Sequence, residues 1–148
     1  MVPWSDFARA VPELAAFGAE RMMAAPAYFA TVAADGLPRV HPVTTIVAPR
    51  GLYVFMEPTS PKGRDLRERR GYAIHNGVPD MNGTGGEFFL RGEGVPVDDV
   101  AERADVIAES TYEPADRYIL FELLVSSARA NGYGDVALPD PARWTAAG

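Results

Sequence analysis

The sequence contains no cysteine in its 148 residues. This absence excludes disulfide bonds, thiolate metal sites and cysteine nucleophiles. Histidine is nearly as scarce, because the chain has only His41 and His75. No carboxylate stands at metal-ligand spacing from either histidine, so we expect no zinc site.

Long apolar runs and a surplus of positive charge are also missing. The longest apolar runs are far too short to cross a bilayer. The N-terminal segment carries Asp6, Glu13 and Glu20 where a signal peptide would have a basic start and an apolar block. A net charge of −6 argues against nucleic-acid binding, which needs a broad basic surface. We therefore expect a cytoplasmic protein with neither a membrane nor a nucleic acid as partner.

What is present fits an ordinary folded chain. Hydrophobic residues make up 47% of the sequence and charged residues 23%, a balance that argues against wholesale disorder. The length suffices for one hydrophobic core, and no repeat or linker divides the chain. We predict a single domain over residues 1–148.

Residues 1–25 have the pattern of a helical segment. Apolar side chains from Phe7 to Met22 recur near helical spacing, and Ser5 is a candidate N-cap. Proline does not fit the interior of a helix, so we predict two short helices, the second beginning close to Pro12.

From Ala27 onwards the pattern is that of β-strands. Asp35-Gly36 separates two β-rich runs within residues 27–48 and predicts a hairpin. Further strands are predicted at 52–56, 72–76, 87–97 and 117–133, with short helices after Ser60 and after Asp98. Six strands in mostly hairpin order indicate a small antiparallel barrel.

Positive charge is concentrated in residues 56–76, MEPTSPKGRDLRERRGYAIHN. Ser60-Pro61 predicts an N-cap followed by a first-turn proline. Free N–H groups and the helix dipole favour a phosphate there, and Lys62 and Arg64 could grip it. The alternative is a capped surface helix with a solvated basic face. Spacing alone slightly favours this alternative.

A second candidate is the segment 38–45, PRVHPVTT. Arg39 and His41 share one face of the predicted strand because side chains alternate. Pro42 cannot donate to a ladder, so the strand is expected at an edge or a bulge, where its backbone could meet a ligand. The alternative is an exposed Arg–His pair on the outside of the barrel. A lone histidine is weak evidence for a general acid or base.

Three stretches, in this order, resemble the flavin-binding split-barrel family related to pyridoxamine 5′-phosphate oxidase. They are AYFATVAADGLPRVHPVTTIV (27–47), GLYVFMEPTSPKGRDLRERRGYAIHN (51–76) and EFFLRGEGVPVDD (87–99). The ordered set is more specific than any one of its motifs. The resemblance implies a mainly β (α+β) fold, a six-stranded antiparallel split β-barrel with short flanking helices.

The resemblance also implies a cofactor site. In this family the strand matching RVHPVTT runs beside the isoalloxazine ring, partly contacting it through backbone groups, and the segment matching SPK binds the FMN phosphate. The residues nominated in this way are Arg39, His41, Pro42, Val43, Thr44, Ser60, Lys62 and Arg64. The family forms homodimers with the cofactor at the subunit interface, so a homodimer is expected.

By this resemblance the protein is an FMN-dependent oxidoreductase acting on a small molecule, with Arg39 or His41 as hydrogen-bond donor to the N1–C2=O edge of the ring. One alternative is an F420-dependent reductase on the same fold, since the Lys–Arg cluster would also suit the anionic tail of F420. Another is a flavin- or haem-binding module without turnover. The end PARWTAAG, with only Arg143, lacks the basic C-terminal region of true pyridoxamine 5′-phosphate oxidases and argues against vitamin-B6 activity.

Overall fold

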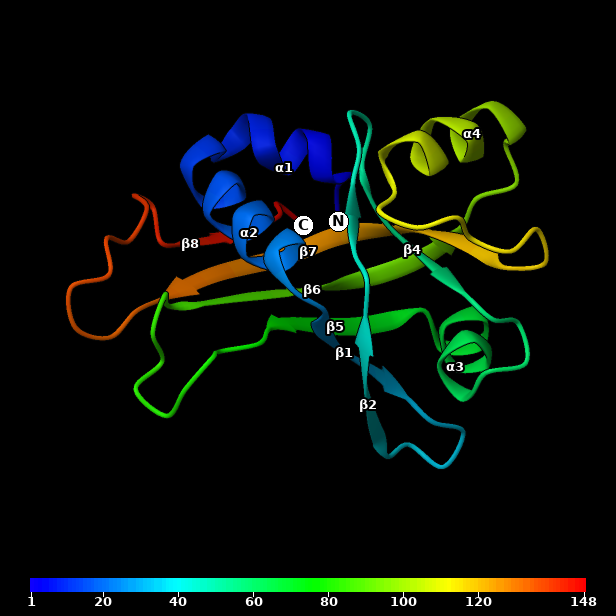
Figure 1. The fold of residues 1–148 in the computed structure, drawn as a ribbon, viewed down its shortest axis with the longest axis horizontal. Helices are drawn as coiled ribbons and strands as arrows, with labels where there is room; N and C mark the ends of the chain where they lie inside the picture. The colour runs from blue at the N-terminus through cyan, green and yellow to red at the C-terminus, as the bar shows by residue number, and fades with distance from the viewer.

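A computed structural model describes residues 1–148 (Figure 1). The elements in chain order are α1 (Trp4–Ala10), α2 (Pro12–Ala24), β1 (Ala27–Val32), β2 (Pro38–Val43), β3 (Ile46–Val47), β4 (Leu52–Met56), α3 (Pro61–Arg69), β5 (Gly71–Asn76), β6 (Glu87–Pro96), α4 (Val100–Glu109), β7 (Ile119–Asn131) and β8 (Arg143–Thr145). None of the helices combines the length and the apolar character needed to span a bilayer.

The strands form one antiparallel sheet in the order β2-β1-β5-β6-β7-β4-β3, with β8 paired to β7. β2 and β3 lie at opposite ends of this order, yet only Thr44 and Thr45 separate them along the chain. The sheet must therefore curl until its two edges approach each other, which makes it a split barrel. The predicted mainly β, antiparallel split-barrel fold is confirmed.

All six predicted strand segments are present, and the sheet has two further short strands. β3 is separated from β2 where the chain crosses between the sheet edges at Thr44 and Thr45. β8 lies in the tail, which has no strand pattern of its own. It is a strand because it pairs with the long β7, Ser127 opposite Thr145 and Arg129 opposite Arg143.

The N-terminal segment forms two helices on either side of Val11, as predicted from Pro12. The prediction of Ser5 as N-cap is wrong, because α1 begins at Trp4 and no side chain caps it. Trp4 is buried and packs edge-on against Phe7, with ring centroids 5.0 Å apart, so apolar anchoring fixes this start. The cap of α4 is Asp99, one residue after the predicted Asp98.

The main core lies between the α1–α2 pair and the curled sheet (Figure 1). Gly18 of α2 permits this packing, since a Cβ there would lie 2.4 Å from the ring of Phe88 on β6. The opposite face of β1, β2, β5, β6 and β7, called the outer face below, carries exposed apolar side chains. Tyr28, Val40 and Phe89 are among them.

Candidate functional site

The start of α3 has the predicted cap. The Ser60 hydroxyl accepts the N–H of Gly63 at 3.1 Å and donates to the carbonyl of Glu57 at 2.7 Å. The side chain of Ser60 is therefore engaged in holding the turn. Gly63 is required by the same turn, because a Cβ there would lie 2.6 Å from the Glu57 carbonyl oxygen.

The first turn of α3 retains one free donor and two free charges. Pro61 has no N–H, and the N–H groups of Gly63 and Arg64 bond to Ser60, which leaves the N–H of Lys62 without an intrahelical partner. Neither Lys62 nor Arg64 forms an ion pair, although the chain has seven ion pairs elsewhere. Both cations can therefore bind an anion without first losing a protein partner.

A buried carboxylate, Asp65, joins α3 to two strands. It accepts hydrogen bonds from Thr31 on β1 at 2.9 Å, from Arg39 on β2 at 3.0 Å and from Arg69 on α3 at 3.2 Å. Burial acts to raise the pKa of Asp65, but the hydrogen bonds from Arg39, Thr31 and Arg69 lower it below its ordinary value. The ionised carboxylate therefore fixes the side chain of Arg39 against the helix.

A hollow of about 440 Å³ opens where α3 meets the β1–β2 hairpin. Its lining, which defines the α3 hollow, is Ala34, Arg39, Pro61, Arg64, Asp65, Glu68 and Arg69. Two of the nominated side chains, Arg39 and Arg64, thus line one cavity. Only the Nε atom of Arg39 is bonded to Asp65, so its two terminal nitrogens remain available.

His41 lies close to Arg39, Lys62 and Asp65, whose charges act on its imidazole ring. Its Nε2 atom is buried and has no hydrogen-bond partner. Burial lowers the pKa of His41, the charges of Lys62 and Arg39 lower it further, and Asp65 opposes them. The imidazole is therefore neutral at pH 7. A buried ring nitrogen without a partner is destabilising by itself, so a hydrogen-bonding ligand would relieve it.

The side chains of Pro42, Val43 and Thr44, which the sequence also nominated, lie outside the α3 hollow. β2 is an edge strand, paired only with β1, as Pro42 predicted. The side chain of Pro42 is exposed on the outer face, and that of Val43 is buried in the core. Thr44 lines a separate cavity of about 170 Å³ beneath α2. None of the three lines the α3 hollow, so we expect them to reach a ligand at Lys62, Arg64 and His41, called the α3 site below, through their backbone.

Sequence reasoning missed Asp65, Thr31 and Arg69. Asp65 lies in a run of basic residues, and its burial cannot be inferred from local spacing. The available signal was weak: Asp65 falls beside Leu66 on the inward side of a short helix. Its three donors come from β1, β2 and α3, and only the tertiary structure brings them together.

No protein-family model and no curated protein sequence matches this chain. Solved structures do. The heme storage protein HutZ from Vibrio cholerae is similar over 83% of this chain and 95% of its own, with 20% identity and a TM-score of 0.66. A candidate pyridoxamine 5′-phosphate oxidase from Listeria innocua is similar over 80% of this chain and 95% of its own, with 14% identity and a TM-score of 0.62.

An F420 reductase is similar over 74% of this chain and 94% of its own, with 19% identity and a TM-score of 0.55. At such identities the similarity shows the fold and does not carry the activity with it. The fold is the split barrel of pyridoxamine 5′-phosphate oxidase-like proteins, which confirms the resemblance seen in the sequence.

Proposed function

We propose that the protein is an FMN-dependent oxidoreductase that holds the cofactor phosphate at the start of α3. The observation that carries this proposal is the cluster of Lys62, Arg64 and His41. Two cations without ion-pair partners lie at a helix N-terminus, beside a buried imidazole nitrogen without a hydrogen-bond partner. Such a cluster, on a split barrel, suits a ligand with a phosphate and a polar ring.

The charged side chains divide the binding between them. Lys62 supplies a point charge and Arg64 a fork that matches two phosphate oxygens. The hydroxyl of Ser60 shapes the turn, since both of its hydrogen bonds are to the backbone. Arg39 is held by Asp65 through Nε and lines the α3 hollow, and its terminal nitrogens have no ion-pair partner.

Of the two candidates for bonding the N1–C2=O edge of the ring, His41 is favoured. Its buried Nε2 atom lacks a partner, whereas the guanidinium of Arg39 is already held against α3 by Asp65 and Arg39 lines the α3 hollow. A neutral imidazole can still donate through Nε2–H. A bound flavin supplies hydride transfer at its N5 atom. The chain orients the ring through β2, and burial of the His41 Nε2 atom keeps water from that atom.

The proposal includes a homodimer, with the cofactor at the subunit interface. Its support is the apolar part of the outer face around β1 and β2, where Tyr28 is 51% exposed and Val40 62% exposed. Contiguous exposed apolar groups of this kind mark interfaces. Val40→Asp should shift the protein to monomer in sedimentation analysis, whereas Leu37→Asp, in the exposed hairpin turn, should not. A monomeric wild type would contradict the dimer but not the α3 site.

The direct test is the absorption spectrum of the purified protein followed by titration with FMN. Flavin bands in the blue, or saturable binding of added FMN, support the proposal. A single band toward the violet would instead indicate F420, and a Soret band would indicate haem. These alternatives have support in the solved structures named above, which include a heme storage protein and an F420 reductase. A colourless protein that does not bind FMN contradicts the proposal.

A further inference from the structure

Strand pairing brings two rows of side chains together on the outer face, far from α3 along the sheet. In one row, Phe89 of β6 lies opposite Arg129 of β7, which lies opposite Arg143 of β8. In the next row, Ala73, Arg91, Ser127 and Thr145 follow one another across β5, β6, β7 and β8. A row of large side chains thus lies beside a row in which only Arg91 is large.

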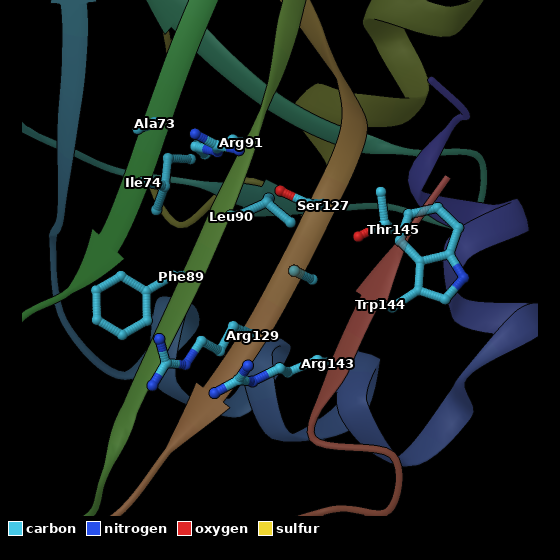
Figure 2. Close-up of a pocket in the computed structure, with 11 residues that line it drawn as sticks. Ala73, Ile74, Phe89, Leu90, Arg91, Ser127, Arg129, Arg143, Trp144 and Thr145 are labelled. Atoms are coloured by element: carbon cyan, nitrogen blue, oxygen red, sulfur yellow. The ribbon is translucent and has the colours of Figure 1, made fainter. Parts of the chain in front are cut away.

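This arrangement leaves a hollow of about 440 Å³, called the outer hollow below. Ala73 and Ser127 are small residues of its lining, and they flank Arg91 on the neighbouring strands β5 and β7. Figure 2 shows Arg129 and Arg143 together at one end, near the ring of Phe89, with Arg91 at the other end. The indole of Trp144 is directed the other way, toward Phe7, at 5.1 Å between ring centroids. The volume suits a small organic molecule.

The charges around the outer hollow are unbalanced. None of the three arginines forms an ion pair, in a chain whose net charge is −6. Arg129 and Arg143 are directly opposite across two strands, an arrangement in which like charges are destabilising. An anion between the two guanidinium groups would remove that repulsion.

The carboxylate of Glu87 lies on the same face but does not neutralise Arg129 or Arg143. Glu87, two residues before Phe89 on β6, contacts His75 at 3.2 Å, Asn131 at 3.0 Å and Tyr133 at 3.1 Å. The hydrogen bond from Asn131, with those from His75 and Tyr133, lowers the pKa of Glu87, so it is ionised and engaged elsewhere. The arginines of the outer hollow are left for a ligand.

We propose that the outer hollow binds a small planar carboxylic acid. Arg129 and Arg143 hold its carboxylate from two sides, and the aromatic body lies over Ser127, between the ring of Phe89 and Arg91. Arg91 accommodates a second polar group at the far end. This site shares no residue with the α3 hollow and lies on β5 to β8, beside the β1–β2 part of the outer face that the proposed dimer uses, so it goes beyond the function proposed above.

The chemistry of the lining favours this class over others. Three cations exclude a metal ion, and a hollow of this volume between strands does not extend along a surface as a polymer site would. An aromatic ring beside a guanidinium pair matches a flat anion. An aliphatic anion could pair with the arginines but would not stack against the ring of Phe89, which would remain exposed.

The experiment is calorimetric titration of the purified protein with 2-naphthoate, and with 2-naphthamide as a neutral probe of the same shape. We expect naphthoate to bind at one site per chain and naphthamide to bind at least ten-fold more weakly. Arg129→Gln and Arg143→Gln should each weaken naphthoate binding about ten-fold or more, because each removes a charged hydrogen-bonding partner. Ser127→Leu should abolish binding by filling the outer hollow without changing charge.

Two controls separate this site from the rest of the protein. Arg117→Gln removes an exposed arginine that pairs with Glu57, and Lys62→Gln removes a cation of the α3 site. Both should leave naphthoate binding unchanged. If Lys62→Gln weakens naphthoate binding and the outer-hollow variants do not, the proposal is overturned. Equal binding of naphthoate and naphthamide, or no binding of naphthoate, also overturns it, and neither result bears on FMN.

Misfolding of a variant cannot be mistaken for loss of the site. Removing one member of the Arg129–Arg143 pair relieves repulsion, so the thermal midpoint of Arg143→Gln without ligand should equal or exceed that of the wild type. Naphthoate should raise the midpoint of the wild type and not that of Arg143→Gln. An equal rise in both proteins overturns the proposal.

Discussion

The carboxylate of Asp65 on α3 accepts a hydrogen bond of 3.0 Å from the guanidinium of Arg39 on β2. With Thr31 and Arg69 as further donors, this buried group is a polar connection between the helix of the proposed phosphate site and the strand beside it. The geometry of the α3 site therefore depends on a residue that need not touch the ligand.

Asp65→Asn should destabilise the fold by about 2 to 3 kcal/mol, because the nearly isosteric amide cannot neutralise two arginines that remain partly buried. Urea unfolding provides the measurement. Asp6→Asn is the matched control, since Asp6 pairs with Arg9 on an exposed helix, and its effect should stay below about 0.5 kcal/mol. Similar effects of the two substitutions would show that the Asp65 contacts contribute little.

The same carboxylate predicts a pH dependence. The pKa of Asp65 is lower in the folded chain than in the unfolded one. Its contribution to stability is therefore fully present above its unfolded pKa of about 4, and it is lost as the pH falls through the folded pKa. The difference in unfolding free energy between wild type and Asp65→Asn should be constant near neutrality and shrink in acid. A difference that grows as the pH falls would have the wrong sign.

Gly18→Ala should destabilise the protein by about 1 to 3 kcal/mol, although this substitution in a helix interior ordinarily stabilises by up to about 1 kcal/mol. The added Cβ would lie 2.4 Å from the ring of Phe88. Thermal and urea unfolding measure the change. In the background Phe88→Leu, which gives the methyl group room, the same substitution should cost clearly less. An equal cost in both backgrounds would rule out the ring contact as the cause.

Lys62→Ala should weaken FMN binding about ten-fold or more and riboflavin binding by less than about two-fold, because only FMN carries the phosphate. Flavin fluorescence titration distinguishes the two ligands. Arg67→Ala removes one positive charge from an exposed position of the same helix and should leave both affinities nearly unchanged. Equal weakening of FMN and riboflavin by Lys62→Ala would argue against the phosphate assignment.

Local patterns in the sequence were enough to predict the turn before α3 and the edge position of β2. Ser60-Pro61 predicts a cap and a first turn, and the structure has both. Pro42 predicts an edge strand, and β2 is one. In each case one residue type restricts its own backbone, so the prediction needs no distant contact.

The features that escaped prediction depend on partners far apart in the chain. β8 has no strand pattern and exists only because β7 offers it an edge. The buried state of Asp65 requires Thr31 and Arg39, 34 and 26 residues away. The opposition of Arg129 and Arg143 follows from strand register, which alternation within one segment cannot supply.

The crossing of the chain at Thr44 and Thr45 has a dynamic consequence. It links the two rims of the barrel covalently, but β2 keeps a hydrogen-bonded ladder on one side only, with β1, whereas β6 is bonded to both β5 and β7. Detaching β2 breaks one ladder and detaching β6 breaks two, so local opening is easier along the strand that bears Arg39 and His41 than along β6. Amide protons of Arg39, Val40, His41 and Val43 should exchange with solvent before those of β6, and a molecule bound against β2 would slow that exchange first.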